Sequence, residues 1–241
     1  TTSGTATEGT DYGTISDITI SAGATTGTAT LDPTDDNVYE GDETAIIDIS
    51  GVSGKSGVTE NSTQQVSVTI SENESAPTVT LATSATSIAE NAGTSLTLTA
   101  TLSVATTADV TVALSTSGTA TEGTDYTDGS GNIDDIVISA GSTTGTVSFT
   151  PTDDSLYDAT SNETATIAIS GVSGGSASES GTQTVTITIT DNESAPTVTL
   201  ATSGTSIAEN SASTLTLTAT LSTATYQDVT VSIGSSGTAT E

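Results

Sequence analysis

Apolar and polar side chains alternate along several short stretches of the chain. The clearest are residues 96–102, 110–114 and 185–189, in which every second residue is Leu, Ile, Val or Ala and most residues between are Thr. A period of two with many β-branched residues is typical of a strand that buries one face. No stretch of the sequence has the period of an amphipathic helix. The pattern therefore predicts an all-β fold.

The chain also repeats itself. The recurring segments are SGTATEGTDY (residues 3–12 and 117–126, and in part at 236–241), NESAPTVTL (73–81 and 192–200) and IAEN (88–91 and 207–210). Successive copies lie about 115 to 119 residues apart, which is too long for one coil of a solenoid and suits a whole sandwich domain.

We therefore expect one complete repeat at residues 74–192, preceded by the later part of a repeat at 1–73 and followed by the first part of another at 193–241. Seven short strands separated by turn residues fit an antiparallel, immunoglobulin-like β-sandwich. They are expected near residues 77–82, 94–104, 108–115, 133–140, 143–150, 163–171 and 182–190. The flanking parts can be completed by a longer chain or by strand exchange between subunits. We favour the longer chain.

Composition narrows the possible functions. The chain has 30 Asp and Glu residues against a single Lys or Arg, so its formal net charge is −29. This charge repels nucleic acid and anionic lipid, and it favours cations, above all Ca²⁺, which prefers oxygen ligands. Cys and His are absent and only 2% of residues are aromatic, so we expect no disulfides and no enzyme. The sequence contains no apolar run of about 18 residues, so we expect no membrane insertion in this segment.

Acidic residues gather beside predicted strand ends in two repeats. Adjacent carboxylates repel one another unless a cation joins them, and Ca²⁺ accepts six to eight oxygen ligands. The alternative is a solvated acidic loop that only keeps the protein soluble. Because the group recurs once per repeat next to a strand end, we favour Ca²⁺. The groups are Asp153, Asp154, Asp158 and Glu163, and, in the first repeat, Asp35, Asp36, Glu40 and Glu43.

Four motifs resemble those of one known family. They are the SGTATEGTDY decapeptide, DDNVYEGDET at residues 35–44, ITDNE at 189–193 and IAEN near the repeat start. Together they resemble the Calx-beta domain, and the resemblance covers essentially the whole chain. It implies an immunoglobulin-like sandwich of the kind found in sodium–calcium exchangers and many bacterial surface proteins. In the family's sensing members Ca²⁺ binds at loops on one end of the sandwich, whereas many bacterial copies are structural.

The resemblance also implies a set of oxygen ligands in each repeat. The terminal clusters are weaker than in the family's best Ca²⁺ binders, which carry consecutive Asp residues, so we expect fewer or weaker ions here. The implied ligands are Glu90, Asp125, Asp153, Asp154, Asp158, Glu163 and Asp191 in the complete repeat, Asp11, Asp35, Asp36, Glu40, Glu43 and Glu72 in the first, and Glu209 in the third.

Near-identical tandem copies suit length and mechanical continuity, because each copy contacts only its neighbours. We therefore expect the structural region of an extracellular fibre, stalk or adhesin, stiffened by Ca²⁺ at its junctions. The alternative is a Ca²⁺-dependent module that binds carbohydrate or mediates cell adhesion. The expected partners are neighbouring copies of the repeat or subunit, Ca²⁺ and glycans. N-glycosylation patterns, which are weak signals, start at Asn61, Asn73, Asn162 and Asn192.

Overall fold

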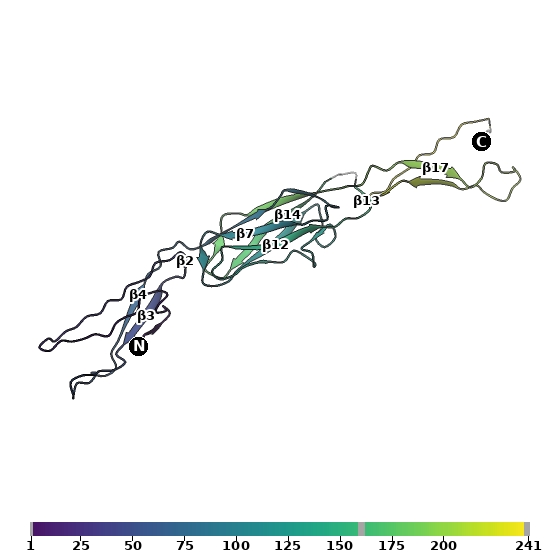
Figure 1. Ribbon diagram of the computed structural model, residues 1–241. Helices are drawn as coiled ribbons and strands as arrows, with labels where there is room; N and C mark the ends of the chain where they lie inside the picture. The colour runs from purple at the N-terminus through teal and green to yellow at the C-terminus, as the bar shows by residue number, and fades with distance from the viewer. Residues whose placement is uncertain (1, 159–161, 239–241) are drawn as a thin grey trace.

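The computed structural model describes residues 2–158 and 162–238. These residues form strands, turns and loops, and they include no helix long and apolar enough to cross a membrane. They form three groups along one long axis, with the two ends of the chain in the two outer groups (Figure 1). We call them the N-terminal group (residues 2–73), the central sandwich (74–192) and the C-terminal group (193–238). The all-β prediction is confirmed.

The central sandwich consists of two five-stranded sheets, each with its strands in a non-sequential order. Most neighbouring strands are antiparallel, and only the short strands β15 and β6 pair in parallel, with β5 and β16. One sheet has the order β10 (Tyr126–Thr127), β12 (Thr144–Pro151), β7 (Leu96–Leu102), β5 (Thr78–Thr83) and β15 (Ser178–Glu179). The other has the order β11 (Ile136–Ile138), β9 (Val110–Gly118), β14 (Glu163–Ser173), β16 (Thr184–Thr190) and β6 (Ser87–Ala89). A strand is present in each of the seven predicted segments.

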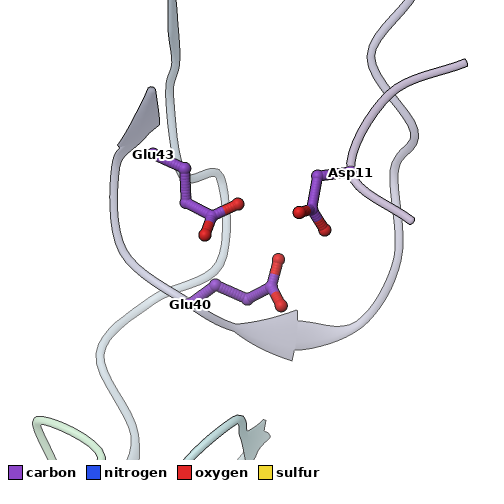
Figure 2. A group of neighbouring side chains, drawn as sticks. All are labelled: Asp11, Glu40 and Glu43. Atoms are coloured by element: carbon purple, nitrogen blue, oxygen red, sulfur yellow. The ribbon is translucent and has the colours of Figure 1, made fainter. Parts of the chain in front are cut away.

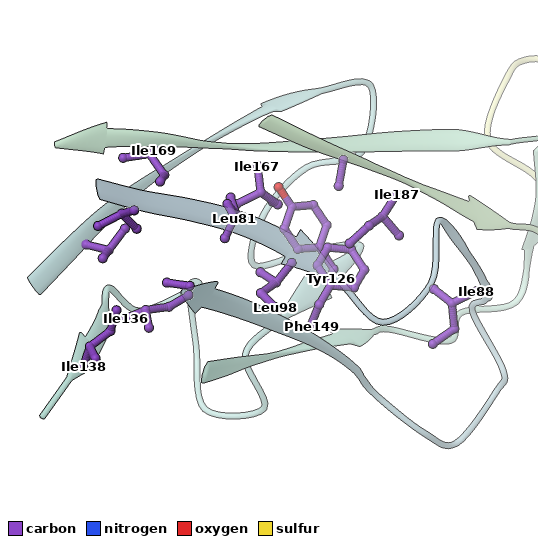
Figure 3. Packing of buried hydrophobic residues seen from close by; sticks show 14 of the residues in the cluster. Leu81, Ile88, Leu98, Tyr126, Ile136, Ile138, Phe149, Ile167, Ile169 and Ile187 are labelled. Atoms are coloured by element: carbon purple, nitrogen blue, oxygen red, sulfur yellow. The ribbon is translucent and has the colours of Figure 1, made fainter. Parts of the chain in front are cut away.

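The core lies between these two sheets and follows from the period of two. Along β7, Leu98, Ala100 and Leu102 point inward and are buried, while the Thr residues between them lie on the outer face. Isoleucines from the opposite sheet pack against this face (Figure 3). Tyr126 and Phe149 stack at its centre, with ring centroids 4.6 Å apart. This burial is the main source of folding free energy, at about 25 cal/mol per Å² of apolar surface.

The first glycine of the SGTATEGTDY motif is required by a close approach of the neighbouring strand. Gly118 ends β9 with φ +124°, and a Cβ atom there would lie 2.0 Å from the carbonyl oxygen of Thr164. Gly4 has φ +119° and the same close approach to Thr44. A side chain is excluded at both positions by the backbone of the neighbouring strand.

The two outer groups contain fewer strands. In the N-terminal group, β1 (Thr2–Gly4), β3 (Glu43–Asp48) and β4 (Gln65–Ile70) form a three-stranded sheet in that order. Its small core contains Ala6, Tyr12 and Ala45. In the C-terminal group, β17 (Val198–Thr202) and β18 (Leu217–Leu221) form an antiparallel hairpin.

Short parallel bridges join the central sandwich to both outer groups. β2 (Val38–Tyr39) of the N-terminal group pairs with β8 (Ala105–Thr106) of the central sandwich. β13 (Leu156–Tyr157) of the central sandwich pairs in the same way with β19 (Ala224–Thr225) of the C-terminal group. The two bridges use corresponding residues of successive repeats, so the junction has the same construction at both places.

Candidate metal centre

Acidic side chains converge at the end of the central sandwich that faces the C-terminal group. They come from the turn after β6, from the turn before β10, from the loop around β13 and from the end of β16. The pocket that they form, the central acidic pocket, is lined by Glu90, Asp125, Thr152, Asp154, Leu156, Asp158, Asn162, Glu163, Ile189, Asp191 and Tyr226.

The turn before β10 holds Asp125 at this pocket. The carboxylate of Asp125 accepts a hydrogen bond from the backbone N–H of Thr121 at 2.6 Å, and its own N–H donates to the carbonyl of Thr121 at 2.9 Å. The next residue, Tyr126, is buried in the core. Because the turn is closed at one end and anchored by a buried ring at the other, Asp125 cannot swing into solvent without disturbing the core.

Asp191 ties together segments that are far apart in the sequence. Its Oδ2 accepts the N–H of Asp158 at 2.8 Å, and its Oδ1 accepts the N–H of Glu193 at 2.7 Å. The N–H of Asn192 donates to Oε1 of Glu90 at 3.2 Å. Carboxylate oxygens of Glu90, Asp154 and Glu193 lie within 4.8 Å of one another. The end of β16 therefore brings the early and late acids of the repeat to one place.

The N-terminal group has an acidic pocket built from the corresponding loops. Asp11, which is buried, Glu40 and Glu43 place carboxylate oxygens within 4.8 Å of one another. Figure 2 shows the three carboxylates pointing toward a common point. Asp11 comes from the turn before Tyr12, Glu40 from the loop after β2, and Glu43 from the first position of β3. The lining of this N-terminal acidic pocket also includes Asp35, Asp36, Glu72 and Glu74.

Glu72 plays the part in this pocket that Asp191 plays in the central one. Its Oε2 accepts the N–H groups of Glu40 and Gly41 at 2.6 and 2.7 Å, and its Oε1 accepts those of Asn73 and Glu74 at 2.9 and 3.0 Å. Burial opposes ionisation, but these N–H groups outweigh it and lower the pKa of Glu72 to about 2. Glu72 is therefore a fixed anion that holds the loop after β2.

Two carboxylates of the central acidic pocket have raised pKa values instead. Burial, with the nearby charges of Asp191 and Glu193, raises the pKa of Glu90 to about 7. Burial, with the nearby charge of Asp125, raises the pKa of Glu163 to about 7. Burial is the larger cause of both shifts, and the neighbouring carboxylates add to it. The chain has a single basic residue, so few protein cations are present to oppose them.

Comparison with known protein families identifies the family of this chain. A family model, the Calx-beta domain, matches the chain twice, at residues 1–74 and 72–193. The chain belongs to the Calx-beta domain family. The match confirms the resemblance deduced from the motifs, and with it the sandwich type of the fold. No curated protein matches the chain.

Calx-beta domains are a non-catalytic family of the Ca²⁺-binding type, and the pockets of this chain suit that chemistry. Their donors are carboxylate, amide, hydroxyl and backbone oxygens, with no His or Cys in the sequence to favour a transition metal. Carboxylate oxygens of Glu90, Asp154 and Glu193 lie close enough together for one divalent cation to contact all three. Bound Ca²⁺ would supply that positive charge and draw the oxygens together.

The structure brings most of the sequence-predicted residues together. In the central repeat, six of them line the pocket, and Asp153 accepts a hydrogen bond from the Asn192 side chain at 3.2 Å nearby. Glu209 is exposed and belongs to neither pocket's lining. Our sequence-based set omitted Glu193, whose carboxylate lies close to those of Glu90 and Asp154. The available signal was the repeated NES tripeptide, which begins directly after Asp191 and after Glu72 and so places a second acid two residues after each.

Proposed function

We propose that this chain is a structural repeat region of a long extracellular fibre, stalk or adhesin, and that Ca²⁺ stiffens the junctions between its sandwiches. In this proposal the repeats meet near residues 73 and 192, as the sequence predicts. One observation carries the proposal: the acidic loop of each repeat is also the segment that pairs with the next repeat. Residues 38–39 lie between Asp36 and Glu40 and form the bridge to β8.

The acids and the bridge are linked by hydrogen bonds within that loop. Oδ1 of Asp36 accepts the N–H of Val38 at 2.7 Å, which turns the chain into β2. Oδ1 of Asp154 accepts the N–H of Leu156 at 2.6 Å, which turns the chain into β13. The same carboxylate that lines a pocket therefore shapes the two residues that reach the next repeat.

A bridge of two residues is weak by itself. It forms few backbone hydrogen bonds, and their free energy is offset by the conformational entropy that the loop loses when it becomes ordered. Without a cation the pocket carboxylates repel one another, and this repulsion favours a spread loop. A bound cation would neutralise the carboxylates and let the loop close. The free energy needed to form the bridge would then be smaller. The expected result is a chain of sandwiches whose junctions bend freely without Ca²⁺ and stiffen with it.

Other features support the extracellular and structural parts of the proposal. The described residues are extended along one axis (Figure 1), and corresponding junctions are built in the same way. Calx-beta domains are typical of extracellular regions and are not catalytic. A strongly acidic surface also keeps long tandem arrays soluble through self-repulsion.

The test is a distance measurement across one junction. The chain has no Cys, so a spin-label pair can be introduced at Ser67→Cys in β4 and Thr80→Cys in β5, both exposed positions. With Ca²⁺ the distribution of inter-label distances should narrow, and with chelator it should broaden. A pair inside the central sandwich, Thr80→Cys with Thr184→Cys, is the control and should not change. Equal widths across the junction with and without Ca²⁺ would show that the ion does not stiffen it.

A further inference from the structure

The loop of residues 35–41, which contains β2, is held at both of its ends by two adjacent residues that follow β4. Glu72 accepts the backbone N–H groups of the last two residues of the loop, at 2.6 and 2.7 Å. Asn73 acts on the start of the loop, where its side-chain Nδ2 donates a hydrogen bond to Oδ1 of Asp35 at 2.8 Å. The bridge to the central sandwich lies between these two attachments. We call Glu72 and Asn73 the first clamp.

The central sandwich repeats this arrangement in the loop of residues 153–158, which contains β13. Asp191 accepts the N–H of the last loop residue at 2.8 Å. Nδ2 of Asn192 donates to Oδ1 of Asp153, the first loop residue, at 3.2 Å. The bridge to the C-terminal group again lies between the two attachments. Asp191 and Asn192 therefore form a second clamp of the same construction.

The two residues of each clamp act with opposite polarity. The carboxylate is an acceptor and holds backbone donors, whereas the amide is a donor and holds a carboxylate. Side-chain cations are scarce, because the sequence has one Lys or Arg against 30 Asp and Glu residues. A hydrogen bond to an ionised acceptor is also stronger than one between neutral groups. The amide therefore gives the first carboxylate of the loop a partner without a cation.

The backbone of each amide residue is itself held by a carboxylate. Oε1 of Glu72 accepts the N–H groups of Asn73 and of the following residue, at 2.9 and 3.0 Å. In the second clamp, the N–H of Asn192 donates to Oε1 of Glu90 at 3.2 Å. Because the backbone is already ordered, the amide side chain loses little further conformational entropy when it reaches its partner. This ordering helps an exposed hydrogen bond to compete with water.

An aspartate in place of the asparagine would have the opposite effect. Its side chain has nearly the same shape, but when ionised it cannot donate, and it would bring a second negative charge to Asp35 or Asp153. Two such carboxylates repel each other without a cation, and a divalent cation can join them. The choice of Asn at residues 73 and 192 therefore affects how much of the order of each loop depends on a cation.

We propose that Asn73 and Asn192 are positioning residues, whose amides hold the start of each junction loop without a cation and so limit how far the junction depends on Ca²⁺. Loss of the amide frees the start of the loop. The bridge in the middle of the loop then keeps one of its two attachments, and the junction bends further. The metal-free effect follows from the hydrogen bonds alone, whereas the effect on calcium dependence rests on the proposed function.

The test uses the spin-label pair Ser67→Cys and Thr80→Cys across the first junction, measured first in chelator. Asn73→Ala should broaden the distribution of inter-label distances relative to the parent pair, and Asn73→Asp should broaden it more, because it adds repulsion. The exchange variant Asp35→Asn with Asn73→Asp should restore the parent width, because one amide and one carboxylate are present again and the net charge is unchanged. Asn61→Asp is the matched control, since Asn61 is exposed and lies outside the lining of the N-terminal acidic pocket.

Adding Ca²⁺ distinguishes the positioning role from the proposed calcium function. The ion should narrow the Asn73→Asp distribution more than that of the parent pair, because it joins the two carboxylates; equal narrowing would mean that Asn73 does not limit the calcium dependence. If Ca²⁺ narrows neither distribution, but the broadening in chelator and its reversal by the exchange remain, the positioning role stands and the calcium function fails. In chelator, a parent width for Asn73→Asp, an exchange variant as broad as Asn73→Asp alone, or equal broadening by Asn61→Asp would overturn the positioning role.

Discussion

The hairpin β17–β18 and its counterpart β5–β7 have almost the same sequence and opposite environments. In both, the pairing is antiparallel with the same register, since Leu81 lies opposite Ala100 and Leu200 opposite Ala219. The inward face of β5–β7 is buried, and that of β17–β18 is exposed. Local sequence is therefore enough to set the strand pairing, whereas burial depends on the second sheet.

Most of the stability should accordingly reside in the central sandwich. Pairing two strands contributes little by itself, because isolated hairpins are marginal in water. The free energy of burying apolar side chains is gained only where both sheets meet. Substitutions at corresponding positions, added Ca²⁺ and a change of pH should each affect the two regions differently.

The largest effect is expected from truncating the same leucine in the two hairpins. Leu98→Ala should lower the free energy of unfolding of the central sandwich by about 2–5 kcal/mol, because Leu98 is fully buried. Leu217→Ala should change it by less than about 0.5 kcal/mol, because Leu217 is exposed. Chemical denaturation of each variant measures both. Equal costs would mean that the hairpins contribute equally to stability.

Calcium should have the next largest effect on the stability of the central sandwich. An ion that binds only the folded form at a hundredfold excess over its dissociation constant stabilises it by about 2.7 kcal/mol. The thermal transition of the central sandwich should therefore rise on adding Ca²⁺ to metal-free protein.

Two corresponding glutamates test where this calcium effect originates. Glu90→Gln should reduce the thermal shift, because Glu90 lines the central acidic pocket. Glu209→Gln should leave the thermal shift unchanged, because Glu209 lies in neither pocket. Calorimetry that shows no Ca²⁺ binding, with no thermal shift, would mean that the acidic clusters are only solvated surface.

The sequence predicted the strands of the central sandwich well, because their period of two is visible without knowledge of the partner. The segment predicted at residues 163–171 becomes β14 with the same first residue. The bridges β2–β8 and β13–β19 were not predicted, because two paired residues leave no periodic pattern and depend on the neighbouring repeat.

Only some of the residues at the candidate site were predicted from the sequence. Asp125 and Asp11 follow from a motif whose buried Tyr fixes their position. The repeated NES tripeptide marks Glu193, but its approach to Glu90 depends on how the chain turns after β16, so the tripeptide alone did not place it at the pocket. Glu209 carries the same IAEN motif as Glu90, but it is exposed and lines neither pocket.

The smallest effect is expected from pH, and its sign is fixed by the raised pKa values. Glu90 and Glu163 ionise at about 4.5 ordinarily and at about 7 in the folded chain, mainly because burial disfavours the charged form. The folded state therefore holds these protons more tightly than the unfolded state. Without Ca²⁺, their contribution to stability should be complete below about pH 4.5 and lost as the pH rises through about 7.

Metal-free unfolding measured from pH 5 to pH 8 should thus show the central sandwich losing stability with rising pH. The double variant Glu90→Gln with Glu163→Gln should lose less over the same range, because neither amide ionises. Glu209→Gln should follow the wild type, since its side chain is exposed and outside both pockets. Saturating Ca²⁺ should reverse the trend near neutral pH, because the ion binds only the ionised carboxylates. A wild type whose stability rises from pH 5 to pH 8 without Ca²⁺ would mean that these two carboxylates are not held in a buried, like-charged pocket.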